Sequence, residues 1–245
     1  MKIAPGIHRI ESGNEVVYAV NCGRCYALVD VGSGPLLAEK LDQLKRDRVN
    51  PGQIEALFVT HNHPDHVGAL AAARSQLRAA VVAHRLLVTA LESAPMAAPV
   101  AADLVDHLVE DGDRVEVGRL VFEAHHLPGH TADSVAWQVG DALFVGDIIF
   151  RDGGIGWMDV HWGSCVADYE QSLERLRSFR GLTIYPGHGG FAPLTNDTIE
   201  QALTNLGQLA NASGSPLAAL GRPAPRASRP PGQPGRVISL PNAER

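Results

Sequence analysis

Cysteine is scarce in this chain, with three residues among 245. Three cysteines are too few for a disulfide framework. Cys22 and Cys25 have the spacing of a metal-binding or redox pair, but no second pair accompanies them, so we expect no structural zinc site there. A β-hairpin with a Gly-Arg turn accounts for this spacing. Cys165 lies at the start of an expected helix and is taken as inert.

The chain also lacks a long apolar run and an excess of basic residues. Without 18 or more consecutive apolar residues, no membrane-spanning helix is predicted. The segment at 1–6 lacks the apolar core of a signal peptide, so we expect a cytoplasmic location. The formal net charge of −6 and the absence of a basic stripe argue against a nucleic-acid partner. We therefore expect a small-molecule substrate, while the sequence leaves the oligomeric state open.

Apolar residues make up 45% of the chain, enough for one substantial core. Short β-like runs are expected near 7–12, 15–22, 25–31, 54–60, 79–83, 114–117, 119–127, 134–139, 142–146 and 182–185. Helical patterns are expected near 35–48, 66–77, 85–93, 166–179 and 196–211. This mixture predicts an α/β fold in one domain over residues 1–211.

Residues 212–245 form a tail of different composition, rich in proline and arginine and poor in large apolar side chains. Such a segment buries too little surface to offset its loss of conformational entropy, so we expect disorder. Residues 237–240 are the exception, because this short apolar segment could dock on the domain as a strand.

The strongest functional signal is at 61–66, where His61, His63, Asp65 and His66 supply four possible metal ligands. An apolar run at 54–60 precedes them and a helical pattern follows. Imidazole and carboxylate groups suit Zn²⁺ or Fe²⁺ better than Ca²⁺ or Mg²⁺, which prefer mostly oxygen ligands. The segment therefore predicts a metal site where a strand meets a helix.

Three further ligand candidates follow in order along the chain. His130 and His188 each come directly after a Pro-Gly pair, and Asp147 follows the apolar run at 142–146. Each is expected on a loop at the end of a strand. Seven ligands are too many for one tetrahedral ion and suit two ions, with one carboxylate between them.

This ordered series resembles the metallo-β-lactamase superfamily of metal-dependent hydrolases, over roughly residues 7–191. The resemblance implies a four-layer αββα sandwich with the metals at one edge of two sheets. It assigns His61, His63 and His130 to one metal. It assigns Asp65, His66 and His188 to the other, with Asp147 bridging the two.

The expected chemistry follows from the ligand types. Zn²⁺ lowers the pKa of bound water from 15.7 to about 7, so hydroxide is available at neutral pH. A hydroxide between two cations can attack an activated carbonyl, and a metal can stabilise the developing oxyanion. Asp65 is the expected catalytic residue because it could orient this hydroxide or carry a proton. The sequence thus predicts a hydrolase with two Zn²⁺ per chain, or alternatively one Fe²⁺.

Within the superfamily, the motifs are most similar to glyoxalase II-like (hydroxyacylglutathione hydrolase-like) proteins, which favours a thioester substrate. Asp147 argues against a dedicated β-lactamase, since those enzymes generally lack this bridging residue. Three alternatives stay open: a lactone or other cyclic ester hydrolase, a mononuclear iron persulfide dioxygenase, and a binding protein that retains its metal without catalysis.

Substrate contacts are expected from the glycine- and tryptophan-rich loop at 151–163. The candidates are Trp157, His161 and Trp162 in this loop, together with Tyr185, which lies three residues before His188. Asp133 is expected to orient His130 through a contact outside the metal's own ligands. The remaining histidines are taken as structural: His8, His84, His107, His125 and His126.

Overall fold

The computed structural model describes residues 1–91, 102–158, 163–211, 224 and 234–240, and the structural statements below concern these residues. Two seven-stranded sheets lie face to face, with helices on both outer sides. This arrangement confirms the predicted α/β class and the αββα sandwich.

The first sheet has its strands in sequence order. They are β1 (Lys2–Ala4), β2 (Ile7–Ser12), β3 (Glu15–Asn21), β4 (Tyr26–Val29), β5 (Ile54–Phe58), β6 (Ala80–His84) and β7 (His107–Val109). The strands β1 to β4 pair as antiparallel hairpins, whereas β4 to β7 are parallel. The carboxyl ends of β4, β5 and β6 therefore meet at one edge of this sheet.

The second sheet follows the order β13-β12-β11-β10-β9-β8-β14. Its strands are β8 (Arg114–Val117), β9 (Leu120–His126), β10 (Val135–Val139), β11 (Ala142–Gly146), β12 (Thr183–Pro186), β13 (Ala192–Pro193) and β14 (Val237–Ser239). Here β8 to β11 are antiparallel neighbours, and β11 is parallel to β12.

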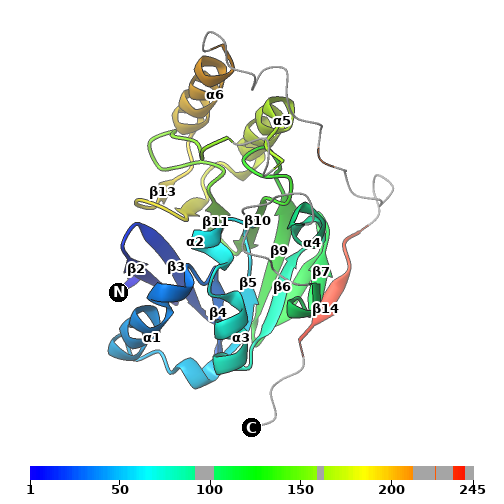
Figure 1. Cartoon of the computed structure of the whole chain (residues 1–245). Coiled ribbons are helices and arrows are strands. Elements are labelled where there is room, and N and C mark those ends of the chain that lie inside the picture. Colours follow the sequence, from blue (N-terminus) through cyan, green and yellow to red (C-terminus); the bar gives the residue numbers. More distant parts are fainter. Residues whose placement is uncertain (92–101, 159–162, 212–223, 225–233, 241–245) are drawn as a thin grey trace.

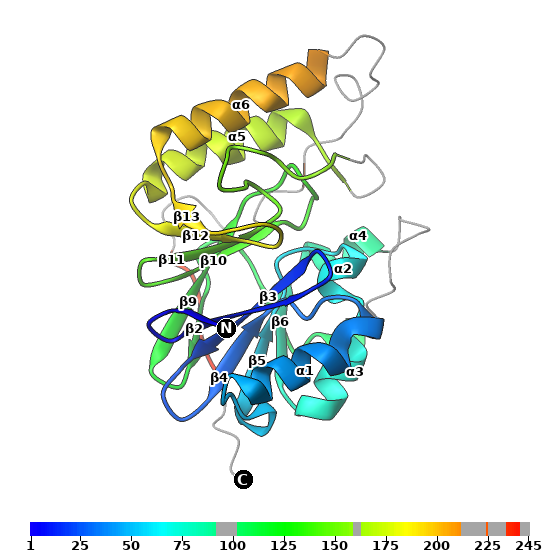
Figure 2. The same cartoon turned by 90° about the vertical axis from the view of Figure 1, so that its left-hand side faces the viewer.

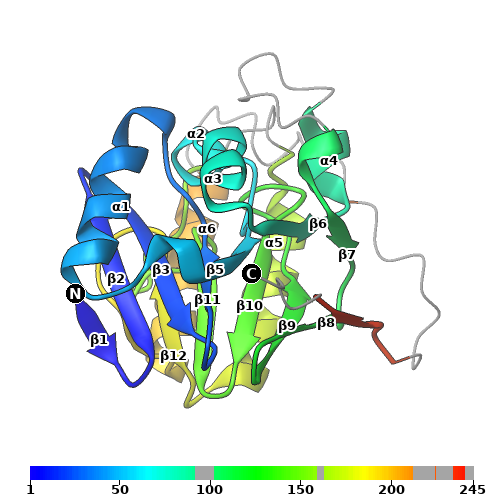
Figure 3. The same ribbon diagram turned by 90° about the horizontal axis from the view of Figure 1, so that it is seen from below.

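Helices cover the outer face of each sheet (Figures 2 and 3). The helices are α1 (Leu37–Arg46), α2 (Pro64–Val67), α3 (Leu70–Leu77), α4 (Leu86–Leu91), α5 (Val166–Leu176) and α6 (Asn196–Asn211). The helices α1 and α3 pack on the first sheet, and α5 and α6 pack on the second. Short 3₁₀ turns lie at Gly34–Leu36, Pro51–Gln53, Ala102–Leu104 and Arg177–Phe179.

The central core lies between the two sheets. Phe58 of β5 stacks on Phe122 of β9 with ring centroids 4.2 Å apart, and Trp137 of β10 packs edge-on against Phe58. The Trp137 indole also donates to the Val59 carbonyl at 2.9 Å, so its one polar atom is satisfied. These contacts join the two sheets directly beneath the edge where the predicted ligands lie.

The expected elements are largely confirmed, with differences at short ones. The strands β1, β7 and β13 were not expected, because two or three residues give no measurable periodicity. The helix expected over 66–77 begins at Pro64 and is interrupted, since α2 ends at Val67 and α3 begins at Leu70. Among the described residues, no helix combines the length and apolar character needed to cross a membrane.

The described part of the tail packs on the domain. The strand β14 pairs in parallel with β8, in agreement with the strand expected near 237–240. The Ala224 N–H donates to the buried Asp168 carboxylate at 2.6 Å. The disorder expected for 212–245 therefore does not hold at these positions, and the other tail residues lie outside the described ones.

Arg236 anchors β14 by pairing with Asp113, whose side chain is fully buried. The guanidinium donates to Asp113 at 2.7 and 3.1 Å, and the Arg236 backbone N–H donates to the same carboxylate at 2.7 Å. Because the Arg236 side chain is 59% exposed, solvent screens part of this attraction.

We expect Arg236→Ala to lower the free energy of unfolding by about 1–2 kcal/mol, because the buried carboxylate of Asp113 loses its cation but keeps its backbone donors. Urea denaturation measures this. The control is Arg114→Ala, which breaks an exposed pair with Glu123 on β9 and should cost about 0.5 kcal/mol or less. Equal losses in the two variants would show that Arg236 is not an anchor.

Candidate metal centre

All seven predicted ligands come together at one edge of the sandwich. His61 and His63 lie in the loop after β5, and Asp65 and His66 lie in α2. The other three lie on loops of the second sheet: His130 after β9, Asp147 after β11 and His188 after β12. Each strand end thus delivers ligands to the same place, as the sequence predicted.

The first group consists of His61, His63 and His130. His61 Nε2 and His63 Nδ1 are 3.1 Å apart, His130 Nε2 is 3.2 Å from His61 Nε2, and it is 3.0 Å from His63 Nδ1. Three ligands of a tetrahedral zinc at about 2.0–2.1 Å would be roughly 3.3 Å apart. The three nitrogens therefore form a triangle of nearly the size that zinc requires.

The second group consists of Asp65, His66 and His188, with Asp147 between the groups. His188 Nε2 is 3.1 Å from Asp65 Oδ2 and 3.2 Å from Asp147 Oδ2. The other Asp147 oxygen is 3.6 Å from His66 Nε2, and Asp147 Oδ2 is 4.0 Å from His130 Nε2. Asp147 thus faces both groups, which suits a carboxylate that bridges two ions.

Two atoms of this cluster are buried without a hydrogen-bond partner, His66 Nε2 and Asp147 Oδ1. A buried polar atom that lacks a partner costs about 1–3 kcal/mol, so native proteins rarely retain one. A metal ion between these atoms would satisfy both. The donor set and the unpaired atoms therefore fit a metal centre.

Glycine allows the backbone to approach the ligands closely. A Cβ at Gly187 would lie 2.3 Å from His66 Cε1 and 2.7 Å from Asp147 Oδ1. A Cβ at Gly156 would lie 2.5 Å from His130 Nδ1. Any larger residue at these two positions would displace a ligand.

Asp30 is a functional residue that sequence analysis missed. It follows β4 and is buried, and its Oδ2 accepts from His66 Nδ1 at 2.8 Å. The Thr60 backbone N–H and hydroxyl both donate to the same carboxylate at 2.8 Å. The Thr60 hydroxyl oxygen also lies 3.0 Å from His61 Nδ1. Asp30 and Thr60 therefore orient His66 and His61 through the Nδ1 atoms, on the side of each ring away from the cluster.

Backbone carbonyls orient two other histidines. His130 Nδ1 donates to the Trp157 carbonyl at 2.7 Å, and His188 Nδ1 donates to the Asn14 carbonyl at 2.6 Å. A carbonyl can only accept, so in both rings Nδ1 carries a proton and Nε2 is the nitrogen that faces the cluster. The partner of His130 is therefore Trp157, not Asp133 as expected. Asp133 is buried, and burial raises the pKa of its carboxyl to about 7.

In the metal-free protein, the first group is prepared to bind as neutral imidazoles. Burial, reinforced by the neighbouring imidazoles, lowers the pKa of His61 well below its usual value and that of His63 to about 3. Burial also lowers the pKa of His130. Because only the unprotonated ring coordinates a metal, these shifts favour binding at neutral pH.

The second group is held as charged pairs. Burial alone would raise the pKa of Asp65, but the hydrogen bond from His188 and the charges of His66 and His188 together outweigh it and lower the value to about 2. Hydrogen bonds to Asp147 and Asp65 raise the pKa of His188 to about 10. Burial opposes protonation of His66, yet the carboxylates of Asp147 and Asp30 raise its pKa well above the usual value. A bound metal would replace these protons.

Of the four predicted substrate contacts, Trp157 is exposed, Tyr185 is buried, and the other two are not described by the structure. Trp157 is 79% exposed, and its backbone reaches His130. Tyr185 is buried, and its ring packs against Tyr18, Phe144 and Phe191, so its side chain belongs to the core and is not available to substrate. His161 and Trp162 lie outside the described residues.

The cysteines and the remaining histidines lie apart from the ligand cluster. All three cysteines are buried, and none of them forms a disulfide within the described part of the chain. Burial raises the pKa of Cys22 to about 12 and that of Cys25 to about 11, which leaves both as unreactive thiols. The backbone N–H of Cys22 donates to the Cys25 carbonyl at 2.9 Å, as expected for the β3–β4 hairpin. The five histidines taken as structural do not belong to any ligand group among the described residues.

Asp30→Asn should weaken metal binding by about 10–100-fold without unfolding the protein, because the amide keeps the shape of Asp30 but removes the negative charge facing His66. Competition with a chromophoric chelator measures the affinity. The control is Asp42→Asn on the exposed side of α1, which should bind as tightly as wild type. Equal metal affinities of Asp30→Asn and wild type would show that Asp30 does not support the metal site.

Comparison with known proteins agrees with this geometry. The profile of the metallo-beta-lactamase superfamily matches residues 12–188, a range that contains all seven ligands. The Beta-lactamase-like protein 2 homolog of Caenorhabditis elegans is 29% identical over 80% of this chain and 61% of its own length. A hydroxyacylglutathione hydrolase of Pseudomonas paraeruginosa is 41% identical over 41% of this chain and 35% of its own length. The chain thus spans less than two thirds of either relative.

The fold has solved counterparts as well. The crystal structure of ETHE1 from Myxococcus xanthus superposes with a TM-score of 0.65 at 23% identity, covering 86% of this chain and 93% of that one. At this identity the likeness concerns the fold alone. Since the superfamily profile covers most of the chain and the seven ligands converge in the structure, the chain belongs to the metallo-beta-lactamase superfamily of metal-binding hydrolases.

Proposed function

We propose that this protein is a hydrolase with two metal ions, in its native form two Zn²⁺, that cleaves thioesters. The observation that carries the proposal is Asp147, which lies 3.6 Å from His66 Nε2 of the second group and 4.0 Å from His130 Nε2 of the first, and so can join two ions into one centre. The similarity to hydroxyacylglutathione hydrolase over 104 residues supports a thioester as the substrate.

When bound, Zn²⁺ supplies Lewis acidity and lowers the pKa of a coordinated water to about 7. The residues of the chain supply position and charge. His61, His63 and His130 would hold one ion, and Asp65, His66 and His188 the other, with Asp147 shared. The buried carboxylate of Asp30 fixes His66 in place, and the Trp157 and Asn14 carbonyls fix His130 and His188.

Asp65 is the proposed catalytic residue. Its side chain is 39% exposed, at the open side of the cluster, whereas Asp147 is almost completely buried. With its pKa lowered to about 2, Asp65 is an ionised acceptor at neutral pH. It can accept a hydrogen bond from a water molecule and so orient that water toward the carbonyl of a substrate.

The test is turnover of a generic aryl thioester, compared with a panel of lactones and a persulfide, by protein of known metal content. Thioester hydrolysis well above the panel, with two zinc ions per chain, is the expected result. Preferential turnover of a lactone would show that the proposed thioester substrate is wrong, while the proposed metal centre would stand. Oxygen-dependent turnover of the persulfide with one iron per chain would overturn the proposal.

A further inference from the structure

A pocket of about 330 Å³ lies directly beside the metal centre. Its lining includes Phe150, Arg151 and the ligand His188, and the backbone of Gly189 and Gly190 forms one wall. This volume is at the lower end of the range for small-molecule pockets, about 300–1,000 Å³. Because His188 lines both the pocket and the centre, a molecule bound at the metals can extend into the pocket.

The pocket contains a cation without a partner. Within the described part of the chain, the Arg151 side chain makes no hydrogen bond and no ion pair. It lies against Gly190, where an added Cβ would be 2.9 Å from Nη1 and 3.1 Å from Cδ. The glycine therefore leaves space that the guanidinium occupies, and the five donors of that group remain available.

The one carboxylate that lines the pocket is already engaged. Asp152 Oδ1 accepts from the Gly154 backbone N–H at 3.1 Å, which ties this carboxylate into its own turn. Phe150 adds an apolar wall, with its ring centroid 6.3 Å from that of His188. The pocket thus combines an apolar face with one free guanidinium, the group that best matches a carboxylate or phosphate.

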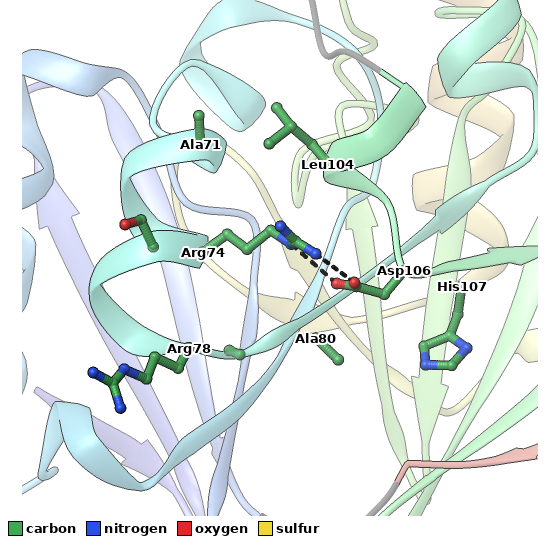
Figure 4. Close-up of a pocket in the computed structure, with 9 residues that line it drawn as sticks. Ala71, Arg74, Arg78, Ala80, Leu104, Asp106 and His107 are labelled. Carbon is green, nitrogen blue, oxygen red and sulfur yellow. Dashed lines mark hydrogen bonds and ion pairs between the residues drawn. The ribbon is translucent and has the colours of Figure 1, made fainter.

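A second hollow of the molecule shows the contrast (Figure 4). It has a volume of about 620 Å³, lies between α3 and the start of β7, and contains Arg74. There the Arg74 guanidinium already donates to Asp106 at 2.6 and 3.2 Å. The exposed Arg78 lines the hollow as well, but no metal ligand does. Of these two pockets, only the one with Arg151 has an arginine next to the metal centre.

We propose that Arg151 forms an anion-binding subsite of the active centre, so that the preferred substrate carries a carboxylate or another anionic group close to the cleaved carbonyl. This inference rests on the proposed function and narrows its substrate class. The apolar Phe150 would contact the carbon chain between the anionic group and the carbonyl. Arg151 binds substrate and takes no part in the bond cleavage itself.

The experiment compares matched substrates that differ by one charge. On the acyl side the pair is S-phenyl monothioadipate and S-phenyl thiohexanoate. On the thiol side it is S-acetyl 3-mercaptopropionate and S-propyl thioacetate. Arg151→Gln should raise KM for the anionic member of at least one pair by about tenfold, with the neutral members and kcat nearly unchanged, since one partly exposed charged hydrogen bond is lost.

Two further variants test whether the effect depends on the guanidinium and on its position. Arg151→Lys should give a smaller rise in KM, because an ammonium keeps the charge but not the fork of donors. Arg46→Gln removes an exposed arginine from the end of α1 and should leave every KM unchanged. Equal effects of Arg151→Gln on charged and neutral members, or no effect on either, would overturn the subsite.

A binding measurement keeps this test separate from the proposed function. The thioether 6-(phenylthio)hexanoate cannot be hydrolysed, and calorimetry with metal-loaded protein gives its Kd beside that of 6-(phenylthio)hexanamide. Tighter binding of the carboxylate by wild type, lost in Arg151→Gln, would support the subsite even if no thioester were turned over. Equal binding of the two compounds by both proteins would refute it.

Discussion

Asp65→Asn is expected to lower kcat/KM for an aryl thioester by about 10²–10⁴-fold while the fold is retained. The amide has nearly the same shape, but it is a poorer metal ligand and cannot accept a proton. Asp65 Oδ2 lies 3.1 Å from His188 Nε2, within the second ligand group, so one ion would also be held less tightly. Steady-state kinetics at saturating zinc measures the catalytic loss.

The control for this variant is Asp141→Asn, which removes an exposed carboxylate between β10 and β11. It should keep wild-type kinetics. Metal content measured on the same samples separates loss of the ion from loss of the base. If Asp65→Asn retained both metals and full activity, the role assigned to Asp65 would be wrong.

Lys40→Met is expected to lower the free energy of unfolding by about 3–5 kcal/mol, the usual cost of removing one partner of a buried ion pair. Lys40 Nζ lies 2.5 Å from Glu15 Oε2, and the two side chains are only 3% and 12% exposed. A Cβ at Gly32 would lie 2.4 Å from Nζ and 2.5 Å from that oxygen, so the pair is tightly enclosed. Chemical denaturation measures the loss.

The double variant Lys40→Met/Glu15→Gln is the matched control. It removes both charges, so much of the stability should return, and the double-mutant cycle gives the coupling between the two side chains. Burial opposes ionisation of Glu15, but the hydrogen bond from Lys40 lowers its pKa below the usual value. The stabilisation is therefore complete above the pKa of an unfolded glutamate and is lost as the pH falls through the lower folded value. A single variant as stable as wild type at neutral pH would contradict this account.

The ligand set could be predicted from sequence because each ligand sits at a strand end that the apolar pattern marks. The run at 54–60 ends directly before His61, and the run at 142–146 ends directly before Asp147. Parallel pairing of β11 and β12 brings Asp147 and His188 to one edge of the second sheet. The meeting of these ligands with those of the first sheet was predicted by the resemblance to the superfamily, not by local signals.

The groups that orient the ligands could not be predicted in the same way. Asn14 and Trp157 act through backbone carbonyls, which every residue has, so the side chains give no signal. Asp30 lies within the strand-like run expected at 25–31, and in the structure it directly follows β4, which pairs in parallel with β5. Carboxylates at the ends of strands adjacent to a ligand-bearing strand are therefore worth examining.

Tyr185 is a residue for which the sequence predicted a role that the structure does not support. Its closeness to His188 in sequence suggested a substrate contact, but β12 alternates its side chains between the two faces of the sheet. Tyr185 points into the core between the sheets, where it packs against Tyr18 and Phe144. Sequence distance from a ligand does not fix which face a strand residue occupies.

The most direct test of the central claim is the identity and number of metal ions in protein purified without added metal or chelator. Elemental analysis should give about two zinc ions per chain, as expected for two ligand groups that share Asp147. About one iron per chain, or no bound metal in an active protein, would contradict the proposed dinuclear zinc hydrolase.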